Sequence, residues 1–242
     1  MQKHLEIVQL KEVDSTNDYM KRLHQKQITV DGCTVIAEEQ KNGKGQRGKS
    51  WESESGKNLL FTFFSDNQEN KAKEQLSFAV SVALVKLIDS LVPGEKATVK
   101  WPNDVLVNGD KIAGILIENR FSGTSLAASF IGIGLNVNQE LFPRFTRPAC
   151  SLKNLTGVKH QLLDIASQLK VMLTKQLNKG AEETKKQYDQ KLYLRGMTVP
   201  FLQQGKQVLY TVKGVSMGGK LELCNAAGEL FQFDLGELKF LR

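Results

Sequence analysis

The feature that most constrains the fold is a pair of apolar runs, residues 98–107 and 111–118, joined by Asn108-Gly109-Asp110. Asn-Gly between two such runs is the strongest short-range signal of a β-hairpin. A third apolar run, residues 127–137, contains Gly132 and Gly134. Glycine inside a strand indicates a bulge or the close approach of a ligand. The middle of the chain therefore predicts an antiparallel sheet.

Further elements are predicted on both sides of this sheet. Residues 34–38 and 58–65 have the pattern of strands, and helical spacing predicts a short helix after the N-cap residues 14–17 and longer helices over 71–91 and 161–177. After Arg195, five short strands separated by glycine-containing turns predict a small barrel. We expect an α+β fold: a mixed, largely antiparallel sheet flanked by helices in residues 1–192, then a small C-terminal β-barrel in residues 193–242.

The positive charge of the chain is unevenly distributed. Of the net charge of +7, residues 151–195 carry +5, whereas residues 1–150 and 196–242 each carry +1. A solvated helix face explains this excess, and a docking surface for an acidic protein partner is the alternative. Neither end of the chain is a basic tail, which argues against nucleic-acid binding through such a tail.

Several classes of protein are disfavoured by the sequence. The opening residues 1–10 have no apolar stretch typical of a signal peptide, and no apolar run approaches the length needed to cross a membrane. Cys33, Cys150 and Cys224 lie far apart, which argues against a disulfide framework and against a zinc site. We therefore expect a cytoplasmic protein with no membrane partner, and we assign no metal ligands.

A glycine loop, residues 41–51, sets three glycines among four cations, with no acidic residue between Glu39 and Glu52. Glycines let successive backbone N–H groups converge on one anion, and Lys44 and Arg47 supply positive charge. This composition is typical of a loop that closes over phosphate. A mobile, solvated basic loop is the alternative, which the composition alone favours because no Walker spacing is present.

Six short motifs occur in a specific order along residues 14–138. They are Ser15-Thr16-Asn17, Glu39-Gln40, Gly43 to Gly48 with Trp51, Lys100-Trp101-Pro102-Asn103-Asp104, Lys111 to Leu116, and Gly132 to Asn136. Together they resemble the biotin protein ligase family. The resemblance implies a class II synthetase-like catalytic domain that uses ATP with Mg²⁺. It also implies two steps: activation of biotin as biotinyl-5′-AMP, then transfer to a lysine of a carrier protein.

The resemblance also implies roles for individual residues. Lys111, Arg47 and Asp104 are the expected catalytic residues, with Lys111 bridging the biotin carboxylate and the α-phosphate. Biotin is expected to contact Ser15, Thr16, Asn17, Gln40, Gly43, Lys44, Gly45, Gln46, Lys111, Gly114 and Gly132. ATP is expected to contact Lys44, Arg47, Trp51, Lys100, Asn103, Asp104, Lys111 and Asn136.

Simpler explanations exist for several of these residues. Lys111 alone could be an exposed lysine in a turn, and Ser15 could be a helix cap. Asn103-Asp104 could simply form a turn. For Asp104, orienting Mg²⁺-ATP and receiving a proton from the incoming lysine remain equally supported. Trp51 also reads as a packing residue beneath the loop.

The glycine loop departs from the family pattern at two positions. The family usually carries Arg where this chain has Lys44, and Arg again where it has Gln46. Lysine keeps the charge but loses the planar fork of arginine, whereas glutamine loses the charge. We therefore expect a weaker hold on the adenylate, which labelling of non-carrier proteins would reveal.

Two other functions are compatible with part of this sequence pattern. A lipoate ligase, or another acyl-protein ligase of the same superfamily, would share the fold and the carrier-lysine chemistry. A DNA-binding regulator is disfavoured, because the fourteen residues before Ser15 are too few for a winged-helix domain. The expected partner is a biotin carboxyl carrier protein, such as the biotinyl domain of acetyl-CoA carboxylase, and we expect no DNA partner. Whether the chain forms a homodimer stays open.

Overall fold

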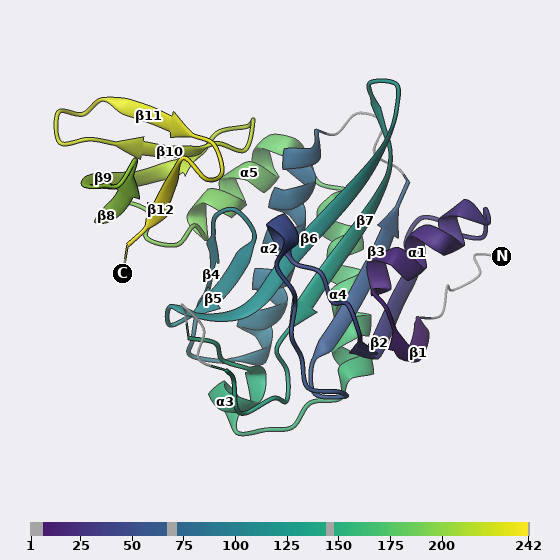
Figure 1. The fold of residues 1–242 in the computed structure, drawn as a ribbon. Helices are drawn as coiled ribbons and strands as arrows, with labels where there is room; N and C mark the ends of the chain where they lie inside the picture. Colours follow the sequence, from purple (N-terminus) through teal and green to yellow (C-terminus); the bar gives the residue numbers. More distant parts are fainter. Residues whose placement is uncertain (1–6, 67–71, 144–147, 242) are drawn as a thin grey trace.

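A computed structural model describes residues 7–66, 72–143 and 148–241 of the chain (Figure 1). Its centre is a seven-stranded sheet. In sheet order, the strands are β1 (Val8–Val13), β2 (Thr34–Gln40), β3 (Leu59–Ser65), β7 (Ser125–Leu135), β6 (Asp110–Ser122), β5 (Asp104–Val107) and β4 (Ala97–Lys100). β1 and β2 are parallel, and every other neighbouring pair is antiparallel. The predicted mixed, largely antiparallel sheet is confirmed.

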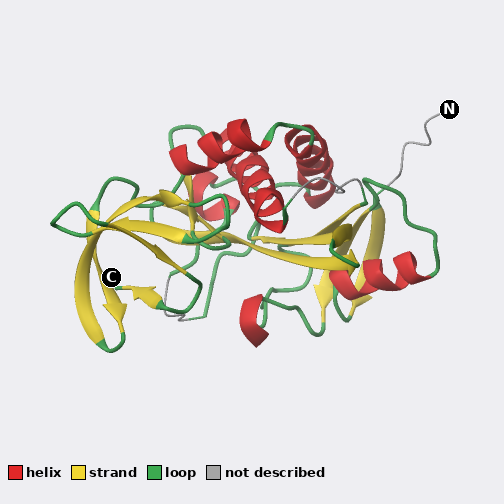
Figure 2. Cartoon of the chain, turned by 90° about the horizontal axis from the view of Figure 1, so that it is seen from above, coloured by secondary structure: helices red, strands yellow, loops and turns green. Residues whose placement is uncertain are grey.

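Helices cover the two faces of this sheet unequally (Figure 2). α2 (Lys73–Leu91), α4 (Leu162–Leu177) and α5 (Ala181–Gln190) lie together on one face, whereas α1 (Thr16–Gln25) lies on the other. A short helix, α3 (Leu152–Thr156), follows β7 in the chain. Side chains alternate along β3, so Phe61 and Phe63 join the core beneath α2, and Phe64 packs near Met20 of α1. The face on the α1 side is only partly covered by a helix.

The predicted hairpin is present between β5 and β6. Asn108 and Gly109 both have positive φ, 53° and 86°, which suits an Asn-Gly hairpin turn. The predicted helices over 71–91 and 161–177 appear as α2 and α4. The charged segment 151–195 contains α3, α4 and α5. β1 was not predicted.

The C-terminal residues form a separate five-stranded sheet in the order β11-β10-β9-β8-β12. Its strands are β8 (Thr198–Gln203), β9 (Lys206–Val215), β10 (Leu221–Cys224), β11 (Leu230–Phe233) and β12 (Leu238–Phe240). All five predicted strands are found, but the predicted barrel is wrong in one respect, because β11 and β12 do not pair and the sheet stays open. These edge strands have four and three residues, and the turn between them is closed locally, where Asp234 N donates to Glu237.

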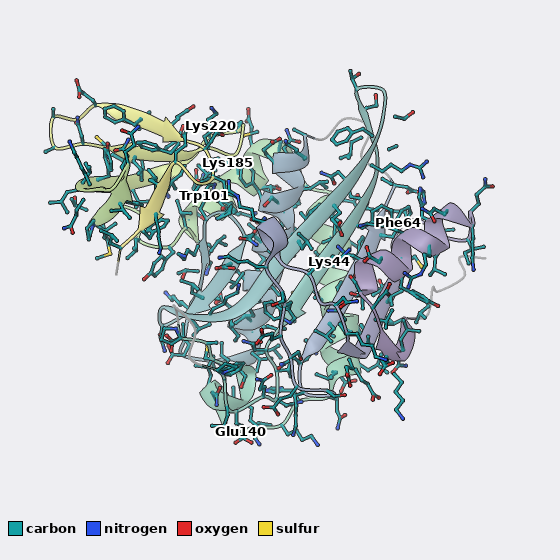
Figure 3. The ribbon with its side chains drawn as sticks, in the orientation of Figure 1. Lys44, Phe64, Trp101, Glu140, Lys185 and Lys220 are labelled. Carbon is teal, nitrogen blue, oxygen red and sulfur yellow. The ribbon has the colours of Figure 1, made fainter. Side chains whose placement is uncertain are left out.

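The two sheets are packed against each other through the segment that follows β4. Trp101 is buried, and its indole N–H donates to the carbonyl of Gly219 at 2.8 Å, in the turn between β9 and β10 (Figure 3). Buried side chains of both sheets belong to one continuous hydrophobic core. The C-terminal sheet is therefore held at the end of the large sheet where β4 and β5 lie.

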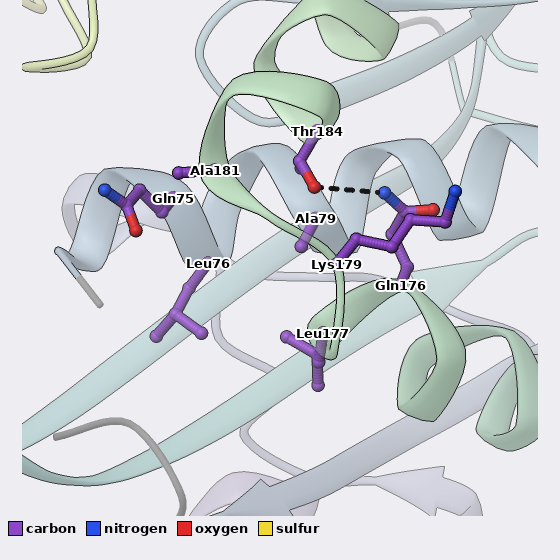
Figure 4. Close-up of a pocket in the computed structure, with 8 residues that line it drawn as sticks. All are labelled: Gln75, Leu76, Ala79, Gln176, Leu177, Lys179, Ala181 and Thr184. Carbon is purple, nitrogen blue, oxygen red and sulfur yellow. Dashed lines mark hydrogen bonds between the residues drawn. The ribbon is translucent and has the colours of Figure 1, made fainter. Parts of the chain in front are cut away.

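A small cavity lies within the helical layer, between α2, α4 and α5 (Figure 4). Gln176 donates to the Thr184 hydroxyl at 3.3 Å beside it. This cavity is on the opposite side of the sheet from α1, so it is separate from the motifs singled out in the sequence. Across the described ranges, no helix combines the length and apolarity needed to cross a membrane.

Candidate functional site

The glycine loop, residues 41–51, is folded as a narrow hairpin that lies across the face of the large sheet on the α1 side (Figure 1). Trp51 N donates to Gly43 O at 2.9 Å, and Gly45 N donates to Lys49 O at 2.7 Å. A single 3₁₀ turn, η1 (Gln46–Gly48), forms its tip, where Arg47 has a φ of 55°. The loop brings its cations over the sheet between α1 and the C-terminal sheet.

A buried cluster of uncharged polar groups lies at the start of α1. The Thr16 backbone N–H and hydroxyl both donate to Gln40 Oε1, at 2.8 and 2.9 Å. The Thr62 hydroxyl lies 2.8 Å from the Thr16 hydroxyl and 2.7 Å from Asn17 Oδ1. Ser15 is the buried N-cap residue of α1, but its side chain makes no capping hydrogen bond to the helix. The cluster offers donors and acceptors to an uncharged polar ligand.

Three glycines form a strip on the adjacent sheet surface: Gly132, Gly134 and Gly114. Gly114 pairs with Gly134 across β6 and β7, and Gly132 pairs with Thr62 of β3. A Cβ on Gly134 would lie 2.3 Å from the Trp51 ring, and one on Gly132 would lie 2.7 Å from Asn17 Oδ1. The missing side chains therefore let Trp51 and Asn17 lie directly on the backbone of the sheet.

The Trp51 ring is the apolar surface of this strip. Its indole Nε1 is buried and has no hydrogen-bond partner in the part of the chain that the structure describes. A buried indole N–H normally has an acceptor.

Lys111 lies at the end of the strip where Gly114 pairs with Gly134. Its ammonium is 2.7 Å from the Asp104 carboxylate and 5.4 Å from the centroid of the Trp51 ring. The backbone of Lys111 is fixed by bonds to the segment 148–150, and the buried Asn136 amide donates to Cys150 O at 3.0 Å and to Lys111 O at 3.4 Å. The backbone of Lys111 is therefore held at both its N–H and its carbonyl, and its ammonium is paired with one carboxylate.

The two cations expected to hold phosphate have protein partners on opposite flanks of the glycine loop, one on α1 and one in the C-terminal sheet. Lys44 Nζ is 2.6 Å from Asp18 of α1 (Figure 3). Arg47 donates to the carbonyl of Leu235 in the turn between β11 and β12. A Cβ on the next residue, Gly236, would lie 2.5 Å from Arg47 Nη1, so this glycine admits the guanidinium.

The remaining predicted residues lie close to this site with different partners. Asn103 bonds through its side chain and its backbone to Ile115 of β6. Lys100 Nζ lies 5.5 Å from the centroid of the Phe240 ring, at the contact with the C-terminal sheet. Gly43, Gly45 and Gln46 belong to the hairpin of the loop. All of the predicted site residues thus lie on one side of the large sheet or in the loop over it, and their individual roles stay predictions.

Sequence reasoning missed several residues that contact the site. Thr62 is the one hydroxyl among the apolar residues 59–64, which is a signal that could have found it. Asp18 and Glu118 could not have been found in this way, because the partners that link them to the site are distant in sequence. Asp18 contacts Lys44 at 2.6 Å, and Glu118 contacts Lys21 at 2.6 Å and Asn17 at 2.8 Å. The contact between Arg47 and Leu235 also left no local signal.

Comparison of the sequence with known proteins identifies the family of this chain. The model of the biotin/lipoate A/B protein ligase family matches residues 10–136. The biotin--[acetyl-CoA-carboxylase] ligase of Paracoccus denitrificans is 41% identical over 105 residues, which cover 43% of this chain and 43% of that protein. The bifunctional ligase/repressor BirA of Escherichia coli is 34% identical over 126 residues, 52% of this chain and 38% of that protein. The matched region thus spans less than half the length of these relatives.

Solved structures resemble the chain over almost its whole length. A biotin protein ligase from Aquifex aeolicus in complex with biotin and ATP aligns with a TM-score of 0.81 and 25% identity, covering 98% of this chain and 99% of that one. A biotin protein ligase from Leishmania major in complex with biotinyl-5-AMP aligns with a TM-score of 0.67 and 22% identity, over 95% and 98% of the two chains. The second likeness concerns the fold alone. Both sheets of this chain are included in these alignments.

Proposed function

Since the chain belongs to the biotin/lipoate A/B protein ligase family, we propose that it is an ATP-dependent ligase that activates biotin and transfers it to a lysine of a carrier protein. The named relatives support biotin as the acid and a carboxylase as the source of the carrier. The observation that supports the proposal most directly is the distance along the glycine strip between two unlike groups, the uncharged polar cluster at the start of α1 and the ammonium of Lys111.

An uncharged polar cluster lies at one end of this strip and a cation at the other. The row of Thr62, Gly132 and Leu116 is two residues from the row of Gly134 and Gly114, which corresponds to about 7 Å along the strands. Lys111 Nζ lies 3.4 Å from the position of a Cβ on Gly114. Biotin has an uncharged ureido ring at one end and a carboxylate at the other, so it matches this polarity.

In the first step, a carboxylate oxygen of biotin attacks the α-phosphorus of ATP. A new P–O bond forms, the bond to the β-phosphate breaks, and pyrophosphate leaves. Both reactants are anions, so a cation between them lowers the barrier by neutralising charge and by holding the two groups in line. Lys111 is the residue proposed for this role, and Asp104, at 2.7 Å, orients its ammonium.

In the second step, the carrier lysine attacks the acyl carbon of biotinyl-5′-AMP. The bond between the acyl carbon and the phosphate oxygen breaks, AMP leaves, and the amine loses a proton. Asp104 is the proposed acceptor of that proton, directly or through water. The Trp51 ring and the glycine loop would exclude water that otherwise hydrolyses the mixed anhydride.

The donor set suits Mg²⁺ that arrives with the nucleotide. Within residues 7–66, 72–143 and 148–241, no group of three carboxylate, histidine or cysteine side chains could hold a metal ion by itself. Mg²⁺ commonly takes one or two carboxylates together with substrate phosphates and water, and Asp104 is the carboxylate proposed for this, as the alternative to its role as proton acceptor. The Mg²⁺ would neutralise phosphate charge. A cytoplasmic setting, where ATP and carrier are supplied, remains part of the proposal.

The choice between biotin and lipoate is tested by transfer to a carrier. The purified chain would be incubated with ATP, Mg²⁺ and the biotinyl domain of an acetyl-CoA carboxylase, with either biotin or lipoate, and the carrier mass would be measured. We expect one biotin on the carrier lysine and no lipoyl group. Lipoylation without biotinylation would contradict the biotin assignment while leaving the family intact.

A further inference from the structure

The glycine loop needs contacts outside itself to stay over the strip. It is a two-stranded hairpin of eleven residues, and a lone hairpin of this kind is marginally stable in water. Its residues are exposed or half-buried, and Lys41, Lys44 and Arg47 contact protein partners outside the loop. The contact of Lys44 with α1 is one of these partners, and its chemistry is open to test.

Asp18 is well suited to hold Lys44. It lies in the first turn of α1, one residue after Asn17, and its carboxylate is 2.6 Å from Lys44 Nζ and 3.2 Å from Lys21 Nζ. Lys21 is in turn 2.6 Å from Glu118 of β6. Asp18 therefore belongs to a row of alternating charges that runs from the loop to the sheet.

The charge state of Asp18 supports the same role. Burial raises the pKa of this carboxyl, but hydrogen bonds from Lys44 and Lys21 outweigh burial, and the net effect lowers the pKa of Asp18. The hydrogen bond from Lys44 to Asp18 likewise raises the pKa of the lysine. Both groups are thus charged at neutral pH, and each favours the charged form of the other.

We propose that Asp18 is a positioning residue that ties Lys44 to α1, keeps the glycine loop closed over the strip, and so sets how long the activated biotinyl-adenylate is retained. This rests on the proposed function. The rival role for Lys44 is direct binding of the adenylate phosphate. The two roles predict opposite effects on adenylate release. If Asp18 holds the loop closed, its loss opens the loop and speeds release. If Lys44 binds the phosphate directly, loss of Asp18 frees Lys44 for the phosphate and slows release.

The first test does not depend on the enzymatic activity of the chain. Trypsin would be added to the free protein, and the rate of cleavage after Arg47 and Lys49 would be compared between the native chain and Asp18→Asn. We expect cleavage about two- to fivefold faster in Asp18→Asn, the size expected of a partly exposed ion pair. Asp18→Glu is expected to restore most of the protection.

Glu12→Gln is the matched control for this test. Glu12 lies 2.6 Å from Lys41, at the base of the same loop, so this substitution also removes one acidic partner of a loop lysine. It leaves the contact between Lys44 and α1 intact, and we expect native cleavage. Equal cleavage in Asp18→Asn and the native chain would overturn the proposal.

The second test measures retention of the intermediate. The enzyme would be loaded with labelled biotin, ATP, Mg²⁺ and pyrophosphatase without a carrier, and the rate at which labelled adenylate leaves would be followed by rapid gel filtration. We expect Asp18→Asn and Lys44→Gln to speed release by similar factors of about two to five, and the double variant to release no faster than either one.

Two results would overturn the proposal that Asp18 ties Lys44 to α1. One is slower release from Asp18→Asn, which would mean that a freed Lys44 binds the phosphate. The other is a double variant whose acceleration equals the product of the two single effects, because independent sites behave in that way. If the native chain forms no labelled complex, the proposed function fails. The trypsin comparison then still tests by itself whether Asp18 holds the glycine loop closed.

Discussion

Gly134 shows at the scale of one residue how this surface becomes a site. A side chain there would collide with the Trp51 ring, because the Cβ position lies 2.3 Å from it. The ring instead lies flat against the strip and approaches Lys111. The absence of a single methyl group therefore determines where the apolar wall of the strip is placed.

Gly134→Ala is predicted to displace Trp51 from the strip. Overpacking a close contact usually costs about 1–3 kcal/mol, so we expect a lower free energy of unfolding, a red-shifted Trp51 emission and loss of biotin-dependent activity. The emission would be measured in a Trp101→Phe background, because the chain has two tryptophans. The stability would be measured by urea denaturation.

Gly180→Ala provides the control. A Cβ on Gly180 would meet nothing within 4 Å, and its φ of −62° is accessible to any residue. We expect native emission and nearly native stability. An unshifted Trp51 emission with full activity in Gly134→Ala would show that Trp51 does not lie on the strip.

Some site residues could be found from sequence, and others could not, for a physical reason. Lys111, Gln40 and Gly132 belong to contiguous motifs, and a motif can be read along the chain. Asp18 acts through a lysine 26 residues away, and Arg47 bonds to a carbonyl 188 residues away. Such contacts depend on how the elements pack, and no local spacing encodes them.

At the scale of the element, the glycine loop has two cations whose partners lie on opposite flanks of the strip. Lys44 contacts α1, and Arg47 contacts the C-terminal sheet. Gln46 lies between them at the tip, in η1, where the family usually carries arginine. The tip therefore lacks one charge that could hold a phosphate.

Gln46→Arg is predicted to reduce the escape of the adenylate. One hydrogen bond to a charged group contributes about 1.5–3 kcal/mol, so we expect labelling of bystander proteins to fall by about tenfold or more. Labelling would be measured with bovine serum albumin as the bystander, in the presence of biotin, ATP and Mg²⁺.

Asn42→Arg adds the same charge at the exposed base of the loop, away from its tip. We expect this control to label the bystander as the native chain does. If both variants reduce labelling equally, net charge of the loop would explain the effect, and a specific role for position 46 would be wrong.

The elements differ in how strongly the sequence encoded them. The hairpin between β5 and β6 was predictable, because Asn108 and Gly109 tolerate the positive φ that its turn requires. β1 was missed, although its residues 8–11 alternate between half-buried and exposed, because it pairs in parallel and not through a hairpin. Its partner β2 lies beyond α1, so no local turn signals the pairing. The open edge of the C-terminal sheet likewise depends on long-range packing.

At the scale of the whole molecule, the site lies where the large sheet, α1 and the C-terminal sheet meet. The large sheet supplies the strip and Lys111, α1 supplies the polar cluster, and the C-terminal sheet contacts both the glycine loop and Trp101. The excess positive charge of residues 151–195 is partly offset by carboxylates outside the segment, since Lys153 pairs with Glu140 and Lys191 with Asp89.

The most direct test of the account is the exchange of labelled pyrophosphate into ATP, because it reports biotin activation without a carrier. Native protein, Lys111→Ala and Lys153→Ala would be compared. Lys153 is the matched control, since it is as exposed as Lys111 and also pairs with a carboxylate, that of Glu140.

We predict biotin-dependent exchange in the native chain and in Lys153→Ala, and a loss of about 100-fold or more in Lys111→Ala, the usual effect of removing one group that stabilises transition-state charge. Exchange that persists unchanged in Lys111→Ala would contradict the proposed site. Folded native protein that shows no exchange with biotin, ATP and Mg²⁺ would contradict the proposed function itself.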